Sequence, residues 1–242
     1  MDLVSIIIPV HNQVIYTDKC LKTLYMFTNL PFEIIVIDNA SRDGTYNLLR
    51  NYKNIKVIRN SINTGFSKSI NQGIMASQGN YILLLNNDTV LGPNWLVNLM
   101  SCIKHRADIG MVGPKSNYVS GMQLQPFNYN GSIEGIIAFM KNFNIPDPKK
   151  WFEVFNLSGF CLLIKREVIN SVGLLDERFK YGGYEDEDYC RRVMNSGYKL
   201  YCAGDTFVYH YGSRTLATNR NFLKHYMENQ KKFFIKWNIN NG

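Results

Sequence analysis

Val4-Ser5-Ile6-Ile7-Ile8-Pro9 opens the chain with a continuous apolar run rich in β-branched residues. Such a run is typical of a strand that is buried on both faces of a parallel sheet. Outward from it, further strand-like runs alternate with segments of helical spacing. We expect strands at Phe32–Ile37, Ile55–Ile58 and Tyr81–Leu85, and helices at Thr17–Phe27, Thr45–Tyr52, Gly65–Ser77 and Trp95–Ile103. This alternation predicts an α/β fold whose central sheet is mostly parallel and flanked by helices.

The second half of the sequence is less regular. Ser116–Lys150 contains Gly, Asn, Pro and Ser throughout, which favours a functional loop or lid, with Trp151 as a further lid, acceptor-contact or core residue. We expect a strand over Val154–Ile164, a helix over Glu185–Asn195, one or two strands over Lys199–Tyr209 and a helix over Asn219–Trp237. Residues 1–215 are therefore predicted to form one domain, with residues 216–242 as a C-terminal helical extension packed on it or following it.

Composition narrows the class of protein. The 242 residues are 45% hydrophobic, which is enough for a real core, and no window reaches the roughly 18 apolar residues of a membrane helix. The N-terminus shows no basic region or cleavage site of a signal peptide. Five scattered cysteines without a CxxC pair indicate reduced thiols. We expect a cytoplasmic protein that works there or at the inner face of the cell membrane.

The formal net charge of +8 leaves three interpretations open. It is compatible with a solvated basic surface, with attraction to an anionic membrane face, or with attraction to an acidic small molecule such as a nucleotide diphosphate. No basic helix or arginine-rich run stands out, so the sequence argues against nucleic acid as a partner.

Polar residues gather where the predicted strands end. Asp38 ends the second strand, Asn60–Gly65 follows the third, and Asn86-Asn87-Asp88 follows the fourth. Ligands of open α/β sheets bind beyond the carboxyl ends of the strands. Asp88 offers a hard oxygen to a divalent cation, whereas Asn86 offers only an amide. Taken alone, the triplet is equally compatible with an ordinary Asn/Asp turn.

Four consecutive carboxylates begin the predicted helix after Tyr184: Glu185-Asp186-Glu187-Asp188. Mutual repulsion raises their pKa values, and the helix dipole relieves part of that cost, so a general base would be well placed here. The alternative is an acidic first turn paired with Arg191 or Arg192. Glu185 and Asp188 share one helix face, so the run need not act as a unit.

Histidines and one loop complete the candidates. His210 follows a strand and precedes a glycine, which suits either a metal ligand or a hydrogen-bonded structural residue. For His11, near the expected end of the first strand, a site role and a packing role are both open, whereas His105 and His225 are expected to be surface or packing residues. The loop from Asn60 to Phe66 precedes a helix, whose backbone amides suit a phosphate or a polar ring; the alternative is a simple loop with a glycine at the helix start.

In this order, the motifs resemble those of the family 2 glycosyltransferases, which have the GT-A fold, and most closely the bacterial branch with rhamnosyltransferase-like enzymes. The resemblance covers roughly Val4 to Ser213. The stretches that carry it are Ser5–Asn12 (SIIIPVHN), Val36–Thr45 (VIDNASRDGT), Asn60–Phe66 (NSINTGF), Leu83–Asp88 (LLLNND), Glu185–Asp188 (EDED) with Arg191, and Val208–His210 (VYH).

The resemblance implies a role for each matching residue. Asp186 would be the base of the family's ED motif, with Glu185 beside it, and Gly159 would line the acceptor side. Asp88 and His210 would hold Mg²⁺ or Mn²⁺. Asn86 stands where the family's DxD motif has its first Asp, and Tyr181–Tyr184 (YGGY) is richer in glycine than expected before ED. The candidate nucleotide-sugar-binding residues are Pro9, His11, Asp38, Asn60, Asn63, Gly65, Asn86 and Asn87.

The resemblance further implies an inverting transfer of a sugar from a nucleotide diphosphate sugar (UDP-, dTDP- or GDP-linked) to an acceptor hydroxyl. The acceptor would be a glycan, a lipid-linked glycan or a protein. Two alternatives stay open: a nucleotide-sugar-binding domain without turnover, which would not need Asp186, and a partner-binding domain of a larger protein. A nucleotidyltransferase is disfavoured because Val10–Gln13 lacks a glycine-rich basic signature.

Overall fold

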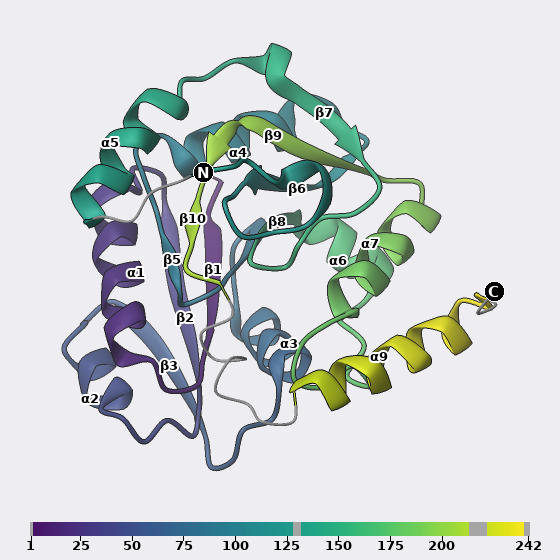
Figure 1. Cartoon of the computed structure of the whole chain (residues 1–242), viewed down its shortest axis with the longest axis horizontal. Coiled ribbons are helices and arrows are strands. Elements are labelled where there is room, and N and C mark those ends of the chain that lie inside the picture. Colours follow the sequence, from purple (N-terminus) through teal and green to yellow (C-terminus); the bar gives the residue numbers. More distant parts are fainter. Residues whose placement is uncertain (1, 128–131, 213–221, 240–242) are drawn as a thin grey trace.

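The first half of the chain alternates strands and helices as predicted (Figure 1). A computed structural model describes residues 2–127, 132–212 and 222–239. Each apolar run forms a strand, because β-branched side chains pack well on a pleated surface. In chain order the elements are β1 (Val4–Val10), α1 (Val14–Phe27), β2 (Phe32–Asn39), α2 (Thr45–Arg50), β3 (Ile55–Asn60), α3 (Phe66–Ala76), β4 (Tyr81–Leu85), β5 (Thr89–Val90) and α4 (Trp95–Lys104).

The region expected to be a long loop contains three helical segments, so that prediction was wrong for those parts of it. After the unanticipated strand β6 (Ile109–Lys115) come η1 (Gly121–Gln123), α5 (Ile133–Phe143) and η2 (Pro148–Lys150). The α5 side chains of Ile136 and Met140 recur at helical spacing and are buried. Glycines and a proline inside β6 break its apolar run, which is why the sequence pattern missed it.

The remaining elements follow the predictions more loosely. The single strand expected over Val154–Ile164 is in fact two strands with different partners, β7 and β8. The elements are β7 (Trp151–Val154), β8 (Cys161–Lys165), α6 (Arg166–Val172), α7 (Glu185–Asn195), β9 (Lys199–Phe207), β10 (Tyr209–His210) and α9 (Phe222–Lys236). The residues 219–221 of the expected last helix lie outside the described part of the chain.

The central sheet has eight strands in the order β3-β2-β1-β4-β8-β6-β9-β7. The β1, β2, β3 and β4 strands pair in parallel, as do β6 and β9, whereas β8 and β7 run antiparallel to their neighbours. The prediction of a mostly parallel sheet flanked by helices is therefore confirmed.

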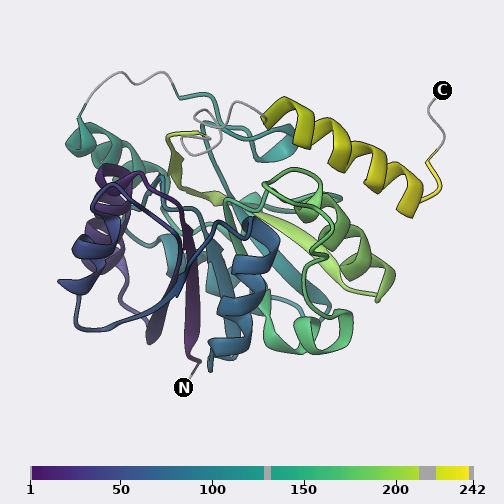
Figure 2. The same ribbon diagram turned by 90° about the horizontal axis from the view of Figure 1, so that it is seen from below.

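Helices cover both faces of the sheet (Figure 2). Because side chains alternate along a strand, Ile6 and Ile8 pack on one face with α1 and α4, and Ile7 packs on the other with α3, α6 and α7. This explains why the opening run is apolar throughout. All five cysteines are buried in these layers as free thiols, in agreement with the expectation. Trp151 packs against the first of these cores, so of its expected roles the structure supports the packing one.

Two features shape the edge of the sheet where β1 and β4 end. β5 and β10 form a short antiparallel ribbon that pairs Thr89 with His210. Helix α9 lies against the loop before α7, where Phe233 packs on Phe179 and Tyr184. Both features bring C-terminal residues beside the ends of the first strands.

Candidate active site

A cavity of about 910 Å³ opens at the carboxyl ends of β1 and β4. The sequence places its walls in several distant segments: the end of β1, the start of α3, the residues after β4, the turn before β8, the start of α7 and the β10 strand. Most predicted site residues lie on these walls. They are Pro9, His11, Asn63, Gly65, Asn86, Asn87, Asp88, Glu185, Asp186 and His210.

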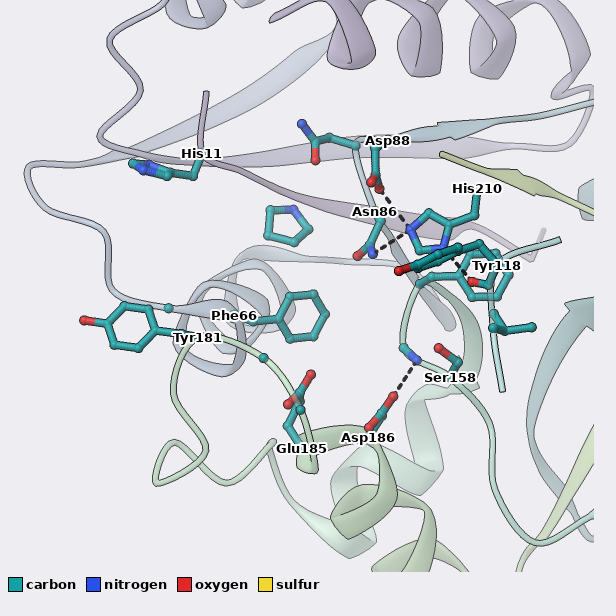
Figure 3. Close-up of a pocket in the computed structure, with 18 of the residues that line it drawn as sticks. His11, Phe66, Asn86, Asp88, Tyr118, Ser158, Tyr181, Glu185, Asp186 and His210 are labelled. Carbon is teal, nitrogen blue, oxygen red and sulfur yellow. Dashed lines mark hydrogen bonds and ion pairs between the residues drawn. The ribbon is translucent and has the colours of Figure 1, made fainter. Parts of the chain in front are cut away.

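Asn86, Asp88 and His210 form one wall, here called the cation corner. The pairing of β5 with β10 and a hydrogen bond from Tyr211 N to Asp88 O hold these distant segments together. As a result, His210 Nε2 lies 3.1 Å from Asp88 Oδ1 and 3.4 Å from Asn86 Nδ2 (Figure 3). The Asp88 and His210 side chains are both buried, so their interaction is weakly screened by solvent.

The environment of His210 fixes which ring nitrogen carries the proton. His210 Nδ1 lies 3.0 Å from the backbone oxygen of Tyr118, and a carbonyl can only accept, so Nδ1 donates. Asn117 bonds both the backbone N and the backbone O of His210 at 2.9 Å, and the Phe160 ring stacks on the imidazole. In the neutral ring, the Nε2 lone pair therefore faces the Asp88 carboxylate.

Asp88 Oδ1 and this Nε2 lone pair are both hydrogen-bond acceptors, and at 3.1 Å they repel each other unless a proton or a cation lies with them. The oxygen and nitrogen ligands of the cation corner therefore fit a divalent metal ion. Within the described ranges, no group of three or more His, Cys, Asp or Glu side chains is arranged to bind a metal. A carboxylate and an imidazole are nevertheless sufficient protein ligands where substrate phosphate oxygens and water complete the shell, as is usual for Mg²⁺.

Glu185 and Asp186, here called the acid pair, form the opposite wall (Figure 3). Asp186 is oriented by two backbone donors: Gly159 N donates to Oδ2 at 3.0 Å, and Glu187 N donates to Oδ1 at 2.9 Å. The pKa of Asp186 is raised by burial, although these two donors oppose the shift. Gly159, predicted to lie on the acceptor side, therefore acts through its N–H.

Glu185 is buried in a different way. Its Oε2 atom has no hydrogen-bond partner among the residues that the structure describes. Burial, assisted by the nearby charge of Asp186, raises the pKa of Glu185 to about 8. At neutral pH the side chain is thus mostly the neutral acid, which can donate a hydrogen bond to a ligand.

As expected, the four acids of this turn do not act as one unit. Which of them lie together, however, differs from the prediction. Glu185 and Asp186 both line the cavity. Asp188, expected to share a face with Glu185, is instead buried between Arg192 at 2.9 Å and Lys236 at 2.6 Å. The alternative, an acidic first turn paired with Arg191 or Arg192, therefore holds for Asp188, which pairs with Arg192.

Two predicted nucleotide-binding residues do not reach the walls of this cavity. Asp38 is buried, where Ser41 N donates to its Oδ1 and Arg59 Nε lies 3.3 Å from its Oδ2. Asn60 donates to Asn39 Oδ1 at 2.9 Å and lines a smaller pocket of about 360 Å³ beside the main one. Both residues form hydrogen bonds within the loops near the cavity. Their contact with a nucleotide stays a prediction.

Several wall residues were missed by the sequence patterns. One of them is Asn39, the last residue of β2. As a second polar residue directly after Asp38 at a strand end, it could have been recognised from the sequence as a candidate site residue. Within the described residues of the expected lid, 116–127 and 132–150, only 117–120 line the cavity. His225, expected to be a surface or packing residue, also lines the cavity and lies against Tyr181, with the ring centroids 4.7 Å apart.

The loop before the acid pair has an unusual backbone. Tyr181, Gly182, Gly183 and Tyr184 all have positive φ, which two glycines permit without strain but two tyrosines do not. Asn229 on α9 donates to the carbonyl oxygens of Lys180, Gly182 and Gly183, at 2.8–3.3 Å. The helix thus holds the glycine-rich loop that the sequence marked as a departure from its expected pattern.

Comparison with known proteins places this geometry in a family. The model of the family "Glycosyl transferase family 2" matches residues 5–173, which include the first part of the cation corner but not α7 or His210. The N-acetylglucosaminyl-diphospho-decaprenol L-rhamnosyltransferase of Mycobacterium tuberculosis is 24% identical over 251 residues, covering 91% of this chain and 79% of that protein.

Other relatives are much longer. The chain is 26% identical to the O-antigen biosynthesis protein RfbC of Myxococcus xanthus, over 87% of its own length but only 17% of RfbC. Among solved structures, the mannosyltransferase PcManGT of Pyrobaculum calidifontis, in complex with GDP-Man and Mn²⁺, superposes with a TM-score of 0.69 at 16% identity, covering 99% of this chain and 65% of that one. This likeness confirms the predicted GT-A fold.

Proposed function

Because the chain belongs to glycosyl transferase family 2, we propose that it moves a sugar from a nucleotide diphosphate sugar to an acceptor hydroxyl with inversion. The observation that carries this proposal is the arrangement of the cavity: the cation corner and the acid pair face each other across it (Figure 3). A diphosphate at the first wall would leave its sugar directed at the second. The product would belong to glycan or glycoconjugate synthesis.

The residues at the ends of β1 and β2 form the nucleotide side. Pro9, His11 and Asn39 line the cavity there, and His11 Nδ1 lies 2.6 Å from the backbone oxygen of Asn39, which fixes the imidazole ring. Gly65 directly precedes α3 as its N-cap, and the N-terminal amides of this helix suit a phosphate. UDP-, dTDP- and GDP-linked donors are all compatible with these contacts.

Asp88 and His210 would hold Mg²⁺ or Mn²⁺. When bound, such a cation supplies positive charge that neutralises the diphosphate. The role of this chain in holding it is to keep His210 oriented: the Tyr118 carbonyl and the Asn117 side chain leave Nε2 directed at Asp88.

Asp186 is the proposed base. As the acceptor oxygen attacks the anomeric carbon, a new C–O bond forms, the bond to the diphosphate oxygen breaks, and the hydroxyl proton passes to an Asp186 oxygen. The two backbone N–H donors hold the carboxylate in place for this transfer. Neutral Glu185 would donate a hydrogen bond to a sugar or acceptor oxygen beside it.

The acceptor would be a glycan, a lipid-linked glycan or a protein hydroxyl, and the enzyme would work in the cytoplasm or at the inner membrane face. In the described part of the chain no helix is long and apolar enough to cross a membrane. Any association with the bilayer would then be peripheral for these residues.

Calorimetry with UDP-, dTDP-, GDP- and CDP-sugars, each with Mn²⁺ and with EDTA, tests the donor site. The proposal expects metal-dependent binding of one nucleotide class, followed by slow release of the sugar to water. A folded protein that binds none of these donors would contradict the proposal. Binding without any release of sugar would favour a nucleotide-sugar-binding domain without turnover.

A further inference from the structure

Two segments frame the mouth of the cavity. Tyr118, Val119 and Ser120 line it directly before η1, and His225 and Tyr226 line it from α9. Figure 2 shows η1, in teal, and α9, in yellow, along the same side of the molecule, away from the N-terminus. The mouth and these two segments therefore share one surface.

Large apolar side chains are exposed on both segments. On α9, Leu223, Met227 and Ile235 are 74%, 61% and 77% exposed, and beside the other rim Met122 of η1 is 61% exposed. Leu223, Met227, Lys231 and Ile235 recur every four residues, so they form one stripe along the outer face of the helix. Clustered exposed apolar residues mark a contact surface.

Exposed lysines also lie on α9. Of its four lysines, Lys236 is paired with Asp176 and Asp188 and Lys232 donates to the backbone oxygen of Arg178, which leaves two facing outward. Its one glutamate, Glu228, has Oε2 3.4 Å from His225 Nδ1. Lys224 and Lys231 are exposed, and no ion pair to either is found among residues 2–127, 132–212 and 222–239. Lys231 interrupts the apolar stripe. The core of a protein interface is depleted of lysine, whereas at a bilayer surface a lysine extends its charge to the headgroups.

Helix α9 is firmly attached to the catalytic wall. Asn229 holds the carbonyls before the acid pair, and Lys236 Nζ and Trp237 Nε1 both bond Asp188 Oδ1, at 2.6 and 3.0 Å. A surface that docks through α9 would thus orient the whole cavity with respect to it.

From these observations we infer that the outer face of α9 and the η1 segment rest on an anionic bilayer, so that the cavity opens at the membrane surface and takes a lipid-linked acceptor. This inference rests on the proposed function for the nature of the acceptor. An apolar stripe with interspersed lysines is the pattern of a helix that lies in a lipid interface, and the chain's net charge of +8 complements anionic headgroups.

Vesicle sedimentation of the full chain, without donor, tests the surface. Vesicles containing phosphatidylglycerol should retain the protein, and vesicles of phosphatidylcholine alone should not. Met227→Glu and Lys231→Glu should each weaken binding about tenfold or more, because each puts negative charge against the anionic surface. The matched controls are Met75→Glu, at a 69% exposed methionine near the C-terminal end of α3, and Lys53→Glu, at an exposed lysine shortly before β3. Both positions lie outside η1 and α9, and both variants should bind as the wild type does.

Failure of the wild type to bind phosphatidylglycerol vesicles would overturn the inference and leave this face to a protein partner. Equal losses in Met227→Glu and Met75→Glu would also overturn it, because the attraction would then be a diffuse charge effect. Donor binding by calorimetry on the same preparations separates the two proposals. Loss of donor binding with intact vesicle binding would count against the function alone.

Discussion

The two walls of the cavity carry similar acids in opposite surroundings. In the cation corner, Asp88 has the His210 imidazole 3.1 Å away. In the acid pair, Asp186 is held by backbone N–H groups, and Glu185 has an oxygen without a hydrogen bond among the described residues. A carboxylate with an imidazole nitrogen beside it offers two ligands to a cation, whereas buried carboxylates without a cationic partner take up protons. The difference predicts separate tasks: one wall holds the donor, and the other handles the proton.

The largest expected effect is on turnover at the acid pair. Asp186→Asn keeps the shape of the side chain but removes the base, so kcat should fall by roughly 10²–10⁴-fold. Metal-dependent donor binding, measured by calorimetry, should be unchanged. A variant that keeps near-full turnover would show that the base has been assigned to the wrong residue.

Asp188 lies in the same helical turn as the acid pair, but its carboxylate has two cationic partners, so the two surroundings can be compared within one turn. Asp188→Asn removes the buried charge shared by Arg192 and Lys236, and should lower the stability by about 3 kcal/mol and Tm by roughly 6–12 °C. The matched control is Asp18→Asn, whose partner Lys22 is also four residues away but exposed, and it should change Tm little. Thermal denaturation of both variants measures this, and equal shifts would contradict the account.

The cation corner should affect binding rather than the proton transfer. Asp88→Asn leaves His210 without a charged partner and should weaken Mn²⁺-dependent donor binding by about 10–100-fold. Binding measured in EDTA should hardly differ between variant and wild type. If the variant bound donor in Mn²⁺ as tightly as the wild type, Asp88 would not be a metal ligand.

The effect expected at Glu185 depends on pH. A folded-state pKa of about 8, above the ordinary 4.5, favours the folded protein below pH 4.5, and this stability is lost as the pH rises to about 8. Glu185→Gln cannot ionise, so it should have a higher Tm than the wild type at pH 9. The gap should shrink as the pH falls toward 4.5, and a gap that is constant with pH would rule out a neutral Glu185.

The fold was largely predictable because the strands and helices of its first half follow from short apolar patterns in the sequence. The run from Val4 to Pro9 is buried on both faces, and its strand needs no knowledge of distant residues. β6 was missed because Gly110, Gly113 and Pro114 interrupt it, and it is stabilised by pairing with β8 and β9 instead. α5 was hidden between irregular flanking segments, although Ile136 and Met140 carry helical spacing.

The candidate site was predictable where chemistry is concentrated in short motifs. The acids of Glu185–Asp186 and the Asn86–Asp88 triplet identify themselves by residue type. Contacts such as that of His225 with Tyr181, or the clamp of Asn229 on the loop before α7, depend on how α9 packs. No local pattern encodes that packing, and the same holds for the burial that separates Asp188 from its neighbours in the turn.

Donor hydrolysis measures the division of labour most directly, since water serves as the acceptor and no natural acceptor is needed. Wild type, Asp186→Asn and Glu185→Gln should be compared with saturating donor and Mn²⁺ at pH 7. The account predicts that Asp186→Asn is at least about 100-fold slower, and that Glu185→Gln, which keeps a neutral donor, stays within about tenfold of the wild type. The reverse order would make Glu185 the base and contradict the assignment of roles across the cavity.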